Sequence, residues 1–108
     1  MKQFILEDEK WEESVKYYYT LKSEVENKKS FIIDVLGREG INHSSDSFEV
    51  LPLDLFIKVG DFIQFCDCIK LNNSKVNSIE SIINDWDFKA FFIDFDEYFV
   101  LRIWETTA

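Results

Sequence analysis

The stretch FKAFFIDFDEYFVLRIW, residues 88–104, decides what kind of fold this chain can adopt. Phe88–Ile93 and Tyr98–Trp104 are rich in the aromatic and β-branched residues that favour strands. Asp94-Phe95-Asp96-Glu97 lies between them and has the composition of a turn. Side chains alternate along a strand, so one face receives Phe99, Leu101 and Ile103, and the other receives Tyr98, Val100, Arg102 and Trp104. The stretch predicts a C-terminal β-hairpin.

Two segments upstream have the spacing of amphipathic helices. From about Asp8 to Glu26, apolar residues recur every three or four positions. Acidic residues crowd the start of this segment and lysines follow toward its end, as the helix macrodipole favours. The second segment begins at Asn77, with Glu80 three residues on as in a capping box. The two apolar stripes are Trp11, Val15, Tyr18, Leu21 and Val25, and Ile79, Ile82, Ile83 and Trp86.

The remaining segments complete a sheet. Phe31–Leu36 and Asp61–Leu71 are predicted to be strands, residues 38–47 a polar loop, and residues 48–59 are ambiguous because Pro52 interrupts them. No repeat or linker divides the chain, so residues 1–108 form a single domain. The predicted class is α+β, with an antiparallel or mixed sheet of four to six strands and two helices packed on it.

The charge balance restricts the kind of partner. The chain carries 21 acidic and 12 basic residues, a formal net charge of −9. Binding to nucleic acid or to an anionic membrane needs clustered Lys and Arg, so both are excluded as expected ligands. A basic protein is the natural complement, although net charge also serves solubility. Aromatic residues make up 17%, more than so small a core needs, and exposed aromatics are good anchors for a protein partner.

The sequence also indicates a compartment. No segment approaches the roughly 18 consecutive apolar residues of a membrane span. The N-terminal residues have no signal-peptide pattern, and two cysteines are too few for a disulfide framework. We therefore expect a cytoplasmic protein, and the usage of Asn, Lys and Ile is typical of a bacterial or phage source.

The motifs that carry catalysis are missing or incomplete. Cys66 and Cys68 would share one face of the predicted strand, but zinc needs about four ligands and His43 is the one histidine. His43 lies among Ser and Asp residues in one loop, whereas triad members normally come from distant segments. Three glycines allow no phosphate-binding loop. We expect no cofactor, no metal and no enzymatic activity.

The candidate partner-binding residues are carboxylates in turns and tyrosines in the first predicted helix. The two carboxylate groups flank a predicted strand, so they lie at its opposite ends and cannot form one metal site. In Tyr17-Tyr18-Tyr19 the middle ring belongs to the apolar stripe, and at least one of its neighbours should reach solvent. The alternative for these rings is packing at the core boundary. The predicted partner-binding residues are Asp85, Asp87, Asp94, Asp96, Glu97, Tyr17 and Tyr19.

In size, acidity and aromatic content the whole chain resembles the small immunity proteins that neutralise bacterial toxins. The resemblance rests on no motif and transfers no site residues. It implies an inhibitor that covers the basic active-site cleft of a cognate toxin, such as a nuclease, and associates quickly through electrostatic steering. Three alternatives stay open: a phage-encoded inhibitor of a host nuclease defence, of the anti-CRISPR type; a small cytosolic enzyme; and a structural adaptor that pairs through a sheet edge.

Overall fold

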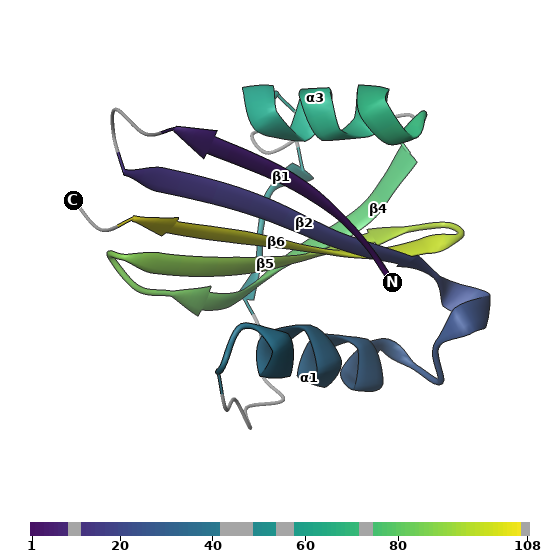
Figure 1. The fold of residues 1–108 in the computed structure, drawn as a ribbon. Coiled ribbons are helices and arrows are strands. Elements are labelled where there is room, and N and C mark those ends of the chain that lie inside the picture. Colours follow the sequence, from purple (N-terminus) through teal and green to yellow (C-terminus); the bar gives the residue numbers. More distant parts are fainter. Residues whose placement is uncertain (9–11, 42–48, 54–57, 72–74, 107–108) are drawn as a thin grey trace.

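Over the residues that the structure describes, the fold is a six-stranded antiparallel sheet with one helix on each face (Figure 1). The computed structural model describes residues 1–8, 12–41, 49–53, 58–71 and 75–106. Its strand order is β1-β2-β6-β5-β4-β3. The elements are β1 (Lys2–Asp8), β2 (Glu13–Leu21), the 3₁₀ turn η1 (Lys22–Glu24), α1 (Lys28–Arg38), β3 (Glu49–Val50), α3 (Gly60–Ile69), β4 (Val76–Asn84), β5 (Phe88–Phe95) and β6 (Tyr98–Thr106). The predicted class, the C-terminal hairpin and the packing of two helices on the sheet are confirmed, although the two helices lie at other residues than predicted.

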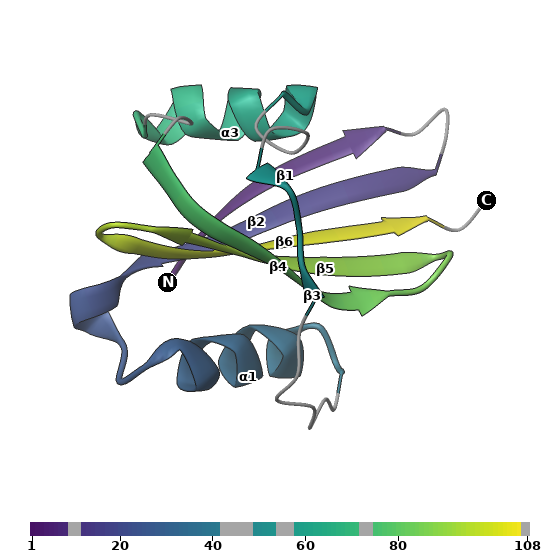
Figure 2. The same ribbon diagram turned by 180° about the vertical axis from the view of Figure 1, so that it is seen from behind.

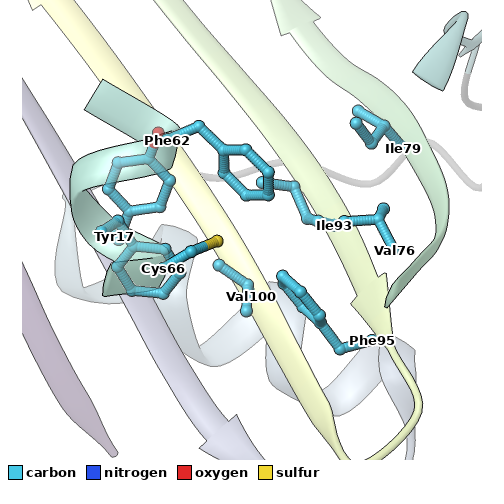
Figure 3. Packing of buried hydrophobic residues seen from close by; sticks show 9 residues of the cluster. Tyr17, Phe62, Cys66, Val76, Ile79, Ile93, Phe95 and Val100 are labelled. Atoms are coloured by element: carbon cyan, nitrogen blue, oxygen red, sulfur yellow. The ribbon is translucent and has the colours of Figure 1, made fainter. Parts of the chain in front are cut away.

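Each face of the sheet packs against its own helix, which gives the chain two hydrophobic cores (Figure 2). Under α3 the buried residues are Tyr17, Phe62, Phe65, Cys66, Val76, Ile79, Ile93, Phe95 and Val100 (Figure 3). Under α1 they are Tyr18, Phe31, Ile32, Val35, Leu36, Ala90, Phe92, Leu101 and Ile103. The central strands therefore need apolar side chains at successive positions rather than at alternate ones.

The helix predicted from Asp8 to Glu26 is wrong, because this segment contains the end of β1 and the whole of β2. Tyr17 is buried under α3 and Tyr18 under α1, as alternation along a strand requires. With both faces covered, the apolar residues of β2 have no clear period of two. Their chance spacing of three and four residues produced the helical pattern.

The strand predicted at Phe31–Leu36 is wrong as well, because these residues lie in α1. The side chain of Asn27 caps this helix by accepting a hydrogen bond from the Ser30 backbone N–H at 2.8 Å. The apolar run looked continuous because Ile33 adds an exposed apolar residue to the buried stripe. The stripe of Phe31, Ile32, Val35 and Leu36 has the spacing of one helix face.

The other two corrections are of the same kind. The strand predicted at Asp61–Leu71 is mostly α3, whose buried residues Phe62, Phe65 and Cys66 follow helical spacing. The helix predicted from Asn77 is β4, a strand with register shifts opposite β5. Among the described helices, none is long and apolar enough to cross a membrane.

Candidate protein-binding surface

The turn between β4 and β5 presents a tryptophan between two carboxylates. The Asp85 N–H donates to the Phe88 carbonyl oxygen at 2.9 Å and closes the turn. Asp85, Trp86 and Asp87 are all exposed, and 77% of the Trp86 surface is accessible to solvent. Trp86 was predicted to lie in a buried helical stripe, and its position at a strand-to-strand turn explains the difference. In the described part of the chain, no cation pairs with Asp85 or Asp87.

Other acidic residues lie at the same end of the sheet. The end of β1, the start of β2, the end of β6 and the β4–β5 turn lie together there (Figure 1). Glu13 is in register with Thr106, whose N–H donates to the Asp87 carbonyl oxygen at 3.1 Å. Glu105 is in register with Phe88. We call this end of the sheet the acidic end and define it by Glu13, Asp85, Trp86, Asp87 and Glu105. Glu13 lies on the α3 face and Glu105 on the α1 face, and both are half-buried.

The strand register adds to the negative charge of the acidic end. Asp8 is directly opposite Glu13 at the β1–β2 pair. The acidic run before Ser14 was assigned to a helix macrodipole, and that explanation fails for the residues of the run that lie in strands, Glu7 and Asp8 in β1 and Glu13 in β2. Residues 9–11 lie outside the described residues.

The other predicted carboxylates lie at the opposite end of β5, as expected. A strand of eight residues separates the two groups by about 25 Å. Asp94 forms an ion pair with Lys22 at 2.8 Å, and the side-chain N–H group of Asn77 donates to Asp96 at 3.0 Å. Asp96 and Glu97 are exposed. These carboxylates therefore form a separate surface, and part of its charge is already neutralised within the chain.

The tyrosines do not form an exposed surface. Tyr17 is fully buried, so its predicted role in partner contact is wrong for the folded chain. Tyr18 is buried as predicted, and its hydroxyl donates to Glu39 at 2.5 Å. Tyr19 is half-buried between Phe65 and Tyr98, with ring centroids 5.4 and 6.4 Å away. Of the two tyrosines predicted to bind a partner, only Tyr19 is partly exposed.

A charged network lies beneath α3, and one feature of the sequence was a hint of it. Arg102 in β6 donates from Nε and Nη2 to the two oxygens of Asp61 in α3, at 2.9 and 3.0 Å. The Tyr17 hydroxyl also donates to Asp61, and Arg102 Nε lies 3.2 Å from the Tyr17 oxygen. Arg102 is 8% exposed and its guanidinium covers the Phe91 ring. The hint was a charged residue inside an apolar strand.

The protonation states of the network follow from burial and from these contacts. Burial raises the pKa of Tyr17 far above its usual value, and the Asp61 charge adds to this. Burial alone would raise the pKa of Asp61, but hydrogen bonds from Arg102 and Tyr17 outweigh it and hold the pKa below its usual value. The network therefore contains a neutral tyrosine, a carboxylate and a guanidinium. Its geometry fastens α3 to the sheet.

The two cysteines lie in different environments. They lie in α3, where Cys66 is buried and Cys68 is exposed, so the prediction that they share a face is wrong. Burial raises the pKa of the Cys66 thiol to about 12, which keeps it protonated. No group of three or more potential metal ligands occurs among the described residues. His43 lies outside them.

Comparison with known proteins adds no assignment: the chain matches no protein-family model, no curated protein sequence and no solved structure.

Proposed function

We propose that this chain is a small inhibitor protein that binds a basic protein partner through its acidic end, with Trp86 as the central anchor. One observation carries the proposal: a tryptophan that is 77% exposed lies between two exposed carboxylates on a closed turn. Trp is among the residues most enriched at binding hot spots. A closed turn fixes the backbone that carries the ring, so little backbone entropy is lost on binding.

The surrounding charge favours a basic partner. A net charge of −9 steers a positively charged protein toward the chain, and the acidic end directs its approach. Exposed charges mainly set the association rate and its dependence on salt, whereas a buried aromatic anchor mainly sets dissociation. The two kinds of residue at the acidic end can therefore be tested separately.

The biological role that fits this surface is that of an immunity-type protein. Carboxylates presented at the end of a sheet can occupy the place of phosphates in the cleft of a toxin nuclease. The same surface would serve a phage-encoded inhibitor of a host nuclease, which is the alternative. A toxin gene beside the gene for this chain favours the first role, and a phage region favours the second.

The test of the anchor is Trp86→Ala against the nuclease encoded beside the gene. About 200 Å² of exposed tryptophan surface, at about 25 cal/mol per Å², sets an upper limit of about 5 kcal/mol. Hot spots of this kind usually contribute about 2–4 kcal/mol, so Kd should rise by about 30- to 1,000-fold, mostly through faster dissociation. Val50→Ala is the matched control, since Val50 is 70% exposed on β3. Equal, small effects of both variants would reject Trp86 as the anchor.

The test of the charges compares two ends of β5. Asp85→Asn/Asp87→Asn and Asp96→Asn/Glu97→Gln each remove two negative charges, at opposite ends of the strand. The first pair should slow association and flatten its salt dependence, and the second should change both less. Stopped-flow kinetics between about 50 and 500 mM salt measure this. Equal effects would show that net charge alone acts, and a larger effect of the second pair would move the contact to the β5–β6 turn.

A further inference from the structure

The two edges of the sheet differ in how they are protected. At one edge β3 has two residues, both exposed, and Pro52 follows soon after it. A very short edge strand with a nearby proline is a common protection against pairing with other chains. At the other edge β1 has seven residues, and among the described residues no strand pairs with its outer side. The long edge therefore offers a row of backbone donors and acceptors.

The central side chains of β1 are apolar, which is unusual for an edge strand that is exposed to water. Ile5 lies at the centre of the strand, on the α1 face, and is 47% exposed. Its neighbours Phe4 and Leu6 are half-buried on the other face, where Phe4 packs edge-on against Phe65 at 5.7 Å. Natural edge strands usually carry charges at such central positions. In β1 the charged residues lie toward the two ends of the strand instead.

We propose that β1 pairs with β1 of a second copy of this chain, antiparallel and centred on Ile5. In this register the two Ile5 residues are opposite one another, and Phe4 is opposite Leu6 of the second copy. At the ends of the pair, Lys2 is opposite Asp8, so residues of unlike charge face one another. The strand is thus complementary to itself in sequence, as a two-fold interface requires.

Neighbouring registers lack this complementarity. A shift of two residues one way places Phe4 opposite Asp8 and Ile5 opposite Glu7. A shift of two residues the other way places Lys2 opposite Leu6 and leaves Asp8 with no counterpart in β1. In the register centred on Ile5 the seven residues form about six to eight backbone hydrogen bonds, and the two sheets join into one of twelve strands.

The inference goes beyond the proposed function and does not depend on it. The two-fold axis runs perpendicular to the sheet, so each helix lies on the same side as its counterpart. Because the two β1 strands run in opposite directions, the two acidic ends point away from each other. The dimer would therefore present its two acidic ends at opposite ends of the paired β1 strands.

The experiment uses the full chain without any partner. Sedimentation equilibrium should give about twice the 12.9 kDa chain mass at concentrations of tens of micromolar. Ile5→Lys places two like charges face to face on the axis and should return the chain to a monomer. Ile33→Lys is the matched control, because Ile33 is 53% exposed on α1 and away from the edge. A monomer in the unaltered chain, or a dimer that survives Ile5→Lys, overturns the inference.

Cysteine cross-linking tests the register directly. In a Cys66→Ala/Cys68→Ser background, Ile5→Cys puts two thiols on directly opposed residues, whose Cα atoms lie about 4.5–5.5 Å apart. This distance suits a disulfide. Gln3→Cys, on the same face of β1, would be opposite Glu7 of the second copy and too far from its own counterpart. Oxidation should join the Ile5→Cys chains alone, and equal joining of the Gln3→Cys chains would reject the register. Circular dichroism confirms that each variant is folded.

Discussion

Asp61→Ala should destabilise the fold strongly, because it leaves Arg102 buried without its carboxylate. The Arg102 side chain is 10% exposed and that of Asp61 is 21% exposed, so water screens the pair poorly. Breaking a buried ion pair by removing one partner costs about 3–5 kcal/mol. For a domain of this size, each kcal/mol lowers Tm by about 4 °C, so Tm should fall by about 12–20 °C. Urea unfolding and a thermal scan measure both quantities.

Two further variants test whether the buried charge causes this loss of stability. Asp34→Ala removes a carboxylate from an exposed pair with Arg38 on α1, where both side chains are 52% exposed, and should cost about 0.5 kcal/mol or less. Asp61→Ala/Arg102→Met also removes the unpaired guanidinium charge and should be more stable than Asp61→Ala alone. If Asp61→Ala costs no more than Asp34→Ala, the network does not fasten α3 to the sheet.

Acid should reproduce part of this loss. The pKa of Asp61 is lower in the folded chain than in the unfolded chain, so its contribution is present above the unfolded value of about 3.9. The contribution disappears as the pH falls through the folded pKa. Unfolding free energies measured from about pH 5 down to about pH 2 should therefore fall less in Asp61→Ala than in the unaltered chain. Parallel acid profiles for the two proteins would contradict the assignment.

The remaining predictions concern single groups and ligands. Because the pKa of Tyr17 is raised by burial, the unfolded state ionises first, and stability should fall above about pH 10; Tyr17→Phe should remove that part of the fall in alkaline urea titrations. A thiol reagent under native conditions should modify Cys68 rapidly and Cys66 only after unfolding, and two fast-reacting thiols would contradict the placement of α3. Fluorescence anisotropy at low salt should detect no binding to DNA or RNA, and clear micromolar binding would overturn the argument for a basic partner.

The elements that could be predicted from the sequence were those whose apolar pattern was not obscured by the helices that cover both faces of the sheet. The β5–β6 hairpin was found because its aromatic and β-branched runs are separated by an acidic turn. β2 was not found, because helices cover both faces of the sheet and its apolar residues lose their alternation. In α1 the exposed Ile33 completed an apolar run that looked like a strand. Two strands were thus predicted as helices and two helices as strands. The predicted α+β class is still correct, because the number of packed helices is the same.

The site was predicted in part for the same reason. Asp85 and Asp87 lie just after the end of β4 in the structure and just after the end of a helix in the prediction. Both arrangements put them in a turn, so their exposure could be predicted from the sequence. The exposure of Trp86 could not, because a predicted helix placed it on the buried stripe. Glu13 and Glu105 join the acidic end through strand register over a separation of about ninety residues, and composition carries no information about such a contact.

The strand order has a consequence for how the chain must fold as it is synthesised. β2 pairs with β6, so the N-terminal hairpin has no neighbour in the sheet until the C-terminal hairpin has left the ribosome. α1 faces the same delay, because Ala90, Phe92, Leu101 and Ile103 of β5 and β6 supply much of the core beneath it. Such non-local contacts slow folding to milliseconds or longer. Aromatic residues of the early segments, Tyr17, Tyr18 and Phe31 among them, therefore have no complete core to enter until translation reaches β6.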